Sequence, residues 1–173
     1  MMPTIFQPLI LLIVCAANTG CDKSESYRLV SEKYNFSVEF PDKPTEQIKV
    51  NIEGLPKSYW QVSRDKAVAK EYYAAEATSY KEILNPDVEL VPNEQLLAQN
   101  GIKMLEHHRI RLRSPATGRQ VDAIATTSKE LSTGATISSI YVVDGHNIVS
   151  VTARVYDNPG KAALFLNSLI ILC

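Results

Sequence analysis

Three histidines are the side chains best suited to bind a metal ion or move a proton in this 173-residue chain. His107 and His108 are adjacent, so on a strand they point to opposite faces and only one of them can approach His146. Because a catalytic zinc centre needs three converging protein ligands, surface or interface histidines are favoured over a metal site. The three cysteines include no CxxC pair, so neither a cysteine-based zinc site nor a thioredoxin-like redox motif is indicated.

The sequence also lacks the short motifs that accompany common catalytic mechanisms. No Gly-x-Ser-x-Gly elbow is present to expose Ser150 or Ser168 as a nucleophile, and neither a Gly-x-Gly-x-x-Gly turn nor a P-loop is present to bind phosphate. Asp87 and Glu89 lie in a proline-containing connection, where solvated carboxylates are favoured over a glycosidase pair. The sequence predicts a protein that is not an enzyme and has no cofactor, and a small hydrolase is the third alternative.

Positive charge is concentrated in one short run that contains Arg109, Arg111 and Arg113. Alternation places these three side chains on one face of a strand, where they form a candidate interaction surface for anionic lipid headgroups or an acidic partner. A solvated outer face is the alternative. The whole chain carries a formal net charge of −1 and is 21% charged, which gives no basic field for nucleic acid.

The elements that position these residues are mainly strands in one globular domain, because period-two alternation dominates from residue 27 onward. Trp60, Tyr72 and Tyr73 lie in such runs and are expected in the core, with a ligand-binding or interface cluster as the alternative. Alternating runs occupy residues 36–40, 48–52, 60–64, 67–78, 102–113, 119–128, 135–143 and 146–155.

Turn and cap residues separate these runs. Arg64-Asp65-Lys66 is typical of a turn, and Asp144-Gly145 suits the positive φ angles of a type I′ hairpin. Residues 79–92 form a connection, with a helical turn expected over residues 80–84. Asn93 is expected to cap a helix that ends at Gly101.

A closing helix is predicted with Asp157 or Asn158 as its cap and Pro159 at its first position. An apolar stripe should pack this helix against the sheet. The stripe consists of Ala163, Leu166, Leu169 and Ile170.

The first twenty residues indicate export. Residues 5–17 are apolar and uncharged, too short to span a bilayer, and typical of the hydrophobic region of a signal peptide. They lead into Asn18-Thr19-Gly20-Cys21, which resembles the lipobox of bacterial lipoproteins, although Asn18 stands where that family usually has an aliphatic residue. The resemblance implies a signal peptide over residues 1–20, lipid attachment at Cys21 and a polar tether over residues 21–26. Asp22 matches the retention residue of enterobacterial inner-membrane lipoproteins, but the rule varies between lineages, so the membrane and its leaflet stay open.

Cleavage after Ala17 by an ordinary signal peptidase is the alternative, with Cys15 and Ala17 as the small residues of the cleavage site. If Cys21 carries lipid, Cys173 remains as an odd thiol. If Cys21 is free, it can pair with Cys173 and join the two ends of the domain.

Four segments of the chain from residue 27 to 173 resemble the PsbP-like domains, the Mog-type α/β/α sandwich, of bacterial envelope lipoproteins. They are residues 36–41, Gly118-Arg119, residues 140–145 and residues 165–168. The resemblance implies an α+β fold in which helices cover an antiparallel sheet, and a noncatalytic domain that is often an accessory to a larger assembly.

We therefore expect a membrane-anchored lipoprotein of the bacterial envelope, facing the periplasm or the exterior, whose domain binds a protein partner. A secreted carrier that encloses a small ligand or lipid in an apolar pocket of its curved sheet is the second hypothesis.

Overall fold

The protein is built from two antiparallel sheets with short helices on either side of the larger one. The computed structural model describes residues 26–65, 70–156 and 158–172. The predicted signal segment, Cys21 and nearly all of the tether lie outside the described residues, as do Cys173 and the alternative cap Asp157. None of the described helices is long and apolar enough to cross a membrane.

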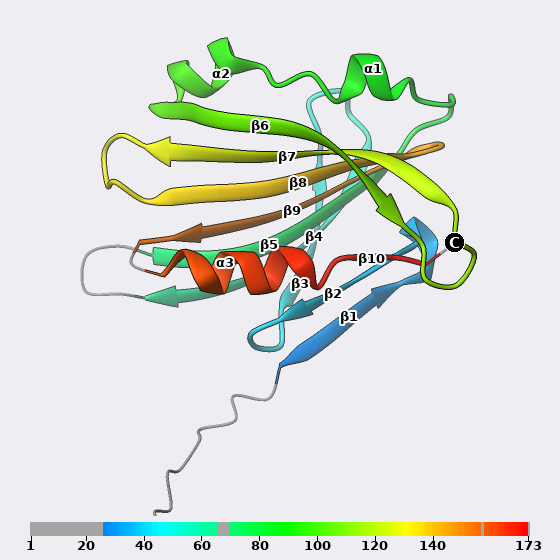
Figure 1. Ribbon diagram of the computed structural model, residues 1–173, viewed down its shortest axis with the longest axis horizontal. Coiled ribbons are helices and arrows are strands. Elements are labelled where there is room, and N and C mark those ends of the chain that lie inside the picture. Colours follow the sequence, from blue (N-terminus) through cyan, green and yellow to red (C-terminus); the bar gives the residue numbers. More distant parts are fainter. Residues whose placement is uncertain (1–25, 66–69, 157, 173) are drawn as a thin grey trace, which may run out of the picture.

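The described elements follow one another along the chain, with strands far outnumbering helices (Figure 1). The strands are β1 (Tyr27–Ser31), β2 (Phe36–Phe40), β3 (Thr45–Val50), β4 (Pro56–Asp65), β5 (Lys70–Ser79), β6 (Ile102–Arg113), β7 (Gln120–Glu130), β8 (Thr136–Asp144), β9 (Asn147–Val155) and β10 (Ile170–Ile171). The helices are the 3-10 turn η1 (Glu32–Tyr34) and the α-helices α1 (Pro86–Glu89), α2 (Glu94–Gln99) and α3 (Pro159–Asn167).

The seven-stranded sheet has the order β3-β4-β5-β9-β8-β7-β6 and consists of two meanders that meet where β5 pairs with β9. The smaller sheet, β1-β2-β10, lies with α3 on one face of the larger sheet, here called the inner face (Figure 1). The segment that carries α1 and α2 covers part of the opposite, outer face. The predicted α+β class, an antiparallel sheet covered by helices, is confirmed; the second sheet was not predicted.

The core lies between the inner face and its covering layer. Phe165 of α3 is 3% exposed. The centre of its ring lies 5.1 Å from the centre of the Phe40 ring and 5.4 Å from the centre of the Tyr73 ring. The predicted stripe on α3 is therefore partly wrong: Ala163 is exposed, and the helix turns Ala162 and Phe165 toward the sheet. The larger ring determines the orientation because it buries far more apolar surface than an alanine methyl group.

The predicted hairpin that joins β8 and β9 is present, but its tight turn differs from the expectation. Asp144 pairs with Asn147 and so belongs to the strands, which leaves Gly145 and His146 as the two loop residues. Gly145 has φ of +61°, and no other described residue of this turn has a positive φ. A glycine at the first central position with a negative φ after it favours type II′ over the predicted type I′.

Two other local predictions are wrong. The helical turn expected at residues 80–84 forms instead at α1, because the side chain of Asn85 caps the amide of Asp87 and Pro86 occupies the first helical position. Arg64 and Asp65 belong to β4 and pair with Glu71 and Lys70, so the expected turn does not begin at Arg64, and its third residue, Lys66, lies outside the described residues.

Candidate functional site

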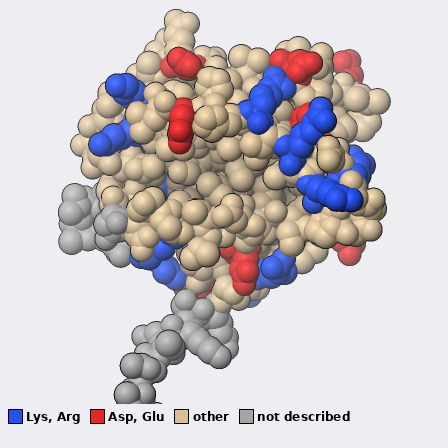
Figure 2. Space-filling view, in the orientation of Figure 1, with Lys and Arg blue, Asp and Glu red and all other residues tan. Residues whose placement is uncertain are grey.

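The predicted arginine surface lies on β6, at the edge of the larger sheet. Arg109 contacts Asp87 of α1 at 3.1 Å, and Arg111 contacts Asp122 of β7 at 3.4 Å. Figure 2 shows basic side chains gathered over the C-terminal half of β6, with acidic side chains beside them. Arg113 is exposed near the hairpin and packs beside Gly118. The three arginines share a face as predicted, but Arg109 and Arg111 each form an ion pair with an aspartate of the same chain.

The histidines and the two candidate serines lie in different surroundings. His107 pairs with Thr126 and His108 with Ala125, so they occupy opposite faces of β6, while His146 bonds the Glu82 carbonyl 2.9 Å away. Within the described ranges, no three His, Cys, Asp or Glu side chains lie close enough together to hold a metal ion. The Ser168 hydroxyl bonds the carbonyl of Phe165 at the end of α3, so it stabilises the helix terminus. Ser150 lines a pocket.

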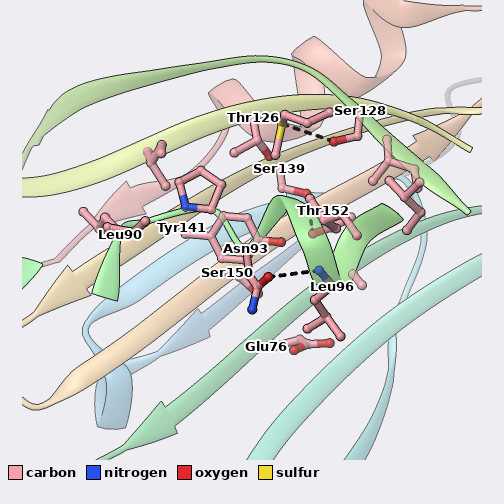
Figure 3. Close-up of a pocket in the computed structure, with 18 of the residues that line it drawn as sticks. Glu76, Leu90, Asn93, Leu96, Thr126, Ser128, Ser139, Tyr141, Ser150 and Thr152 are labelled. Atoms are coloured by element: carbon pink, nitrogen blue, oxygen red, sulfur yellow. Dashed lines mark hydrogen bonds between the residues drawn. The ribbon is translucent and has the colours of Figure 1, made fainter. Parts of the chain in front are cut away.

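That pocket lies on the outer face of the larger sheet and has a volume of about 440 Å³. This volume falls within the range of small-molecule sites, roughly 300–1,000 Å³. Figure 3 shows it between the strands and the covering segment, with side chains from both directed into it. The predicted core position is confirmed for Trp60 and Tyr73, whereas Tyr72 lies on the other face of the sheet and lines the pocket.

Strand register explains why the sheet is hollow here. Four small residues stand side by side across β5, β9, β8 and β7 and form what we call the floor row: Ala74, Thr152, Ser139 and Thr126. Hydroxyl groups within this row bond one another, with 2.9 Å between Ser139 Oγ and Thr152 Oγ1.

Side chains that are mostly larger, with Ser150 and Ser128 as the exceptions, stand on either side of the floor row. We call the row on one side the glutamate row, which comprises Tyr59, Glu76, Ser150, Tyr141 and Ile124. The row on the other side contains Tyr72, Arg154, Ile137, Ser128 and Met104. Short side chains between two taller rows leave the volume that becomes the pocket.

Residues 80–101, here called the lid, form the roof. Leu90 is the buried anchor of the lid, 3% exposed, and packs against Ile124 and Val143 of the sheet. The side chain of Asn93 caps α2 by accepting a hydrogen bond from the amide of Leu96 at 2.9 Å (Figure 3). The predicted cap and the predicted helix end at Gly101, with φ of +71°, are both confirmed.

Three tyrosines give the pocket its hydrogen-bonding character. Burial, followed by the charge of Glu76, raises the pKa of Tyr59 to about 12. Burial likewise raises the pKa of Tyr72 and of Tyr141, and Glu76 adds to both shifts. Tyr141 still has 39% of its surface accessible because its ring faces the open volume. All three phenols therefore remain protonated at neutral pH and present neutral hydroxyl groups to a ligand.

Glu76 is the carboxylate on the floor side of the pocket. Its side chain is 35% exposed and accepts a hydrogen bond from Lys57 at 2.8 Å. The Lys49 ammonium lies 3.4 Å from the centre of the Tyr59 ring at the same end. A second carboxylate, Glu89, reaches the pocket from the lid.

Sequence reasoning did not find this pocket, because its lining comes from six strands and the lid, and no short motif joins them. The residue types at the outward positions of two strands nonetheless indicate a covered face. Outward positions of a solvated sheet usually carry Lys or Glu, whereas those of β8 and β9 carry Ser139, Tyr141, Ser150 and Thr152. Uncharged hydroxyl residues at those positions indicate a face that is covered.

The comparisons with known proteins bear on the fold. No protein-family model matches the sequence, and no curated protein is similar to it in sequence. Among solved structures, the chain is similar to cyanobacterial PsbP (CyanoP) from Synechocystis sp. PCC 6803, with a TM-score of 0.55 and 9% identity. The likeness covers 88% of this chain and 95% of that one. At this identity the similarity concerns architecture: the chain has a PsbP-like α+β fold.

Proposed function

We propose that this protein is a noncatalytic binding domain that takes a small molecule into the pocket beneath the lid. The observation that carries the proposal is the hollow itself, in which small residues occupy the centre of an otherwise well-filled sheet and a separate segment covers them. A sheet face with no ligand to accommodate is normally filled by side chains or left to solvent. The described lining combines hydroxyl groups, apolar side chains and two glutamates, which suits a ligand with both polar and apolar parts.

Copurified ligand tests this proposal directly. We expect native mass spectrometry of the protein from a bacterial host to show a bound small mass. Thr126→Phe, which fills the floor row, should abolish the bound mass, whereas Thr45→Phe on the exposed strand β3 should retain it. Absence of any bound mass, or its persistence in Thr126→Phe, would refute small-molecule binding in this pocket.

We also propose that lipid at Cys21 holds the domain on a membrane of the bacterial envelope, facing the periplasm or the exterior. The support is the apolar segment over residues 5–17 and the lipobox-like residues 18–21. Five residues lie between Cys21 and Tyr27 at the start of β1, and the six steps from one residue to the next span about 20 Å in an extended chain. A single acyl chain binds weakly, so the three chains of a processed bacterial lipoprotein would make the attachment stable.

Intact-mass analysis with and without an inhibitor of lipoprotein signal peptidase tests the anchor. We expect a mature chain that begins at Cys21 and carries lipid mass, and accumulation of the precursor when the inhibitor is present. Cys21→Ser should prevent lipid addition. An unlipidated product that begins near Asn18 would instead make the protein a soluble secreted carrier.

A protein partner at the membrane surface is the second candidate function, and the open edge of the larger sheet favours it. Every residue of β3 is exposed, and Ile48 and Val50 are 77% and 69% exposed, respectively. An exposed apolar edge strand is a template for pairing with a strand of another chain. We expect Ile48→Lys to abolish capture of an envelope protein that the wild-type domain retains; no reproducible capture by either protein would refute this candidate.

A further inference from the structure

The charges that line the pocket restrict the kind of ligand it can hold. Glu76, Glu89 and three tyrosines line the pocket, and no Lys, Arg or His belongs to its described lining. Arg154 stands in the row beside the floor row, but its guanidinium is paired with Glu130. A carboxylate or phosphate ligand placed there would lose its hydration and meet like charge. A cation would meet opposite charge and the electron-rich faces of aromatic rings.

The protein's own lysines already show how cations bind at this end of the pocket. Lys57 donates a hydrogen bond to the Glu76 carboxylate at 2.8 Å, and Lys49 lies 3.4 Å from the centre of the Tyr59 ring. Neither lysine is among the residues that line the pocket, so both approach Glu76 and Tyr59 from outside it. The carboxylate and the ring therefore make up a cation site whose pocket side is available to a ligand.

The end of the pocket at β6, opposite Glu76, is lined mainly by apolar side chains. Glu76 lies on β5, whereas Ile102 and Met104 lie on β6, four strands away across the sheet. At 4.7–4.9 Å per strand, these ends are separated by roughly 19 Å. Leu96 and Leu97 of α2 cover the β6 end from above. A ligand that fills the pocket is thus polar at one end and apolar at the other.

We propose that the pocket binds an organic cation, a primary or quaternary amine joined to an apolar body, with its head at Glu76 between Tyr59 and Tyr141. Cross-strand register places Ser150 between Glu76 and Tyr141, so the head would lie over a small residue with the carboxylate on one side and the Tyr141 ring on the other (Figure 3). Tyr59 stands beyond Glu76 on β4. The apolar body would extend beneath α2 toward Met104. This inference rests on the proposed small-molecule function and names the ligand class.

A matched pair of probes separates charge from shape. Choline and its carbon isostere, in which a tert-butyl group replaces trimethylammonium, have nearly the same size, and hexyltrimethylammonium adds an apolar body. By calorimetry on the full-length domain we expect choline to bind at least about tenfold more tightly than the isostere, and hexyltrimethylammonium more tightly than choline.

Two variants move the affinity in opposite directions. Glu76→Gln should weaken choline binding by about tenfold or more, whereas the exposed control Glu46→Gln should leave it unchanged. Lys57→Met removes the internal competitor for the Glu76 carboxylate and should strengthen choline binding. A merely structural role of Glu76 would not produce this gain.

The outcomes distinguish failure of the ligand class from failure of the site. Equal binding of choline and its isostere, abolished by Thr126→Phe, would overturn the cation proposal and leave the pocket as a small-molecule site. No binding of any of the three probes would overturn the cation proposal, while the mass of a copurified ligand would decide the proposed function independently.

Discussion

At the scale of single residues, ion pairs of this protein differ chiefly in burial. Arg119 makes a two-pronged contact with Asp144, with nitrogen–oxygen distances of 2.7 and 2.8 Å, and the Asp144 side chain is only 6% exposed. Arg111 and Asp122 are instead 71% and 44% exposed. A buried carboxylate that loses its partner keeps the desolvation cost, whereas an exposed one regains water.

We therefore expect Arg119→Ala to lower the free energy of unfolding by about 2–3 kcal/mol and Arg111→Ala by less than about 0.5 kcal/mol. Urea denaturation of the two variants beside the wild type measures both losses. Equal losses would contradict the assignment of Asp144 as the carboxylate that depends on its partner.

Glu130 makes stability depend on acidity. The hydrogen bond from Thr133, followed by that from Arg154, holds its pKa below the ordinary value of 4.5. A carboxyl group with a lowered pKa in the folded state stabilises the fold above its unfolded pKa, and that stabilisation is lost as the pH falls through the folded value.

The melting temperature of the wild type should therefore fall more steeply below about pH 4.5 than that of Glu130→Gln. Thermal unfolding followed by circular dichroism from about pH 6 to pH 3 checks this, with Glu46→Gln as the control expected to behave like the wild type. Parallel curves for wild type and Glu130→Gln would show that this carboxyl group does not set the acid limit.

At the scale of elements, the lid is attached to the sheet by few buried side chains. Among its described residues, Leu90 is the one buried apolar side chain, and α1 and α2 bury none. Segments with so little buried surface open at a lower free-energy cost than the core. The lid is thus the element suited to admit and release a ligand.

Leu90→Ala should accelerate hydrogen exchange of amides in residues 85–100 and leave β2 and β9 protected. Loss of the buried side chain costs about 2–4 kcal/mol of packing, concentrated at the lid. The matched control is Val88→Ala, since Val88 is 65% exposed and should exchange as in the wild type. Uniform acceleration across the sheet would mean that the lid and the core open together.

Elements with local signals were predictable from sequence, and the pocket was not. Alternation identified β6 residue for residue, and Asn93 with Gly101 marked α2, because these signals act over a few positions. Asn85 and Pro86 also form a local helix-start signal, which the prediction of a connection over residues 79–92 overlooks. The neighbours Tyr72 and Tyr73 show the limit: which ring enters the core depends on strand pairing 80 residues away.

At the scale of the whole molecule, the short strand β10 completes the smaller sheet by pairing with β2. Ile171 is 2% exposed and stands opposite Phe36, and the amide of Leu172 donates a hydrogen bond to the carbonyl of Asn35 at 2.9 Å.

We expect Ile171→Ala to reduce the free energy of unfolding by about 2–4 kcal/mol. Urea denaturation measures the loss, and Leu164→Ala is the control, since Leu164 is 75% exposed. A similar loss in both variants would show that the β10 contact adds nothing.

The position of β2 between β1 and β10 sets the order in which the chain can fold. Ser37 of β2 pairs with Ile170 of β10, which lies 133 residues later in the chain. The pairing of β2 with β10 therefore cannot form until these late residues are available. The strand β2, one of the first core strands in the chain, stays paired with β1 alone until the residues of β10 are in place. The final packing of the smaller sheet is thus coupled to residues that lie 133 positions apart in the sequence.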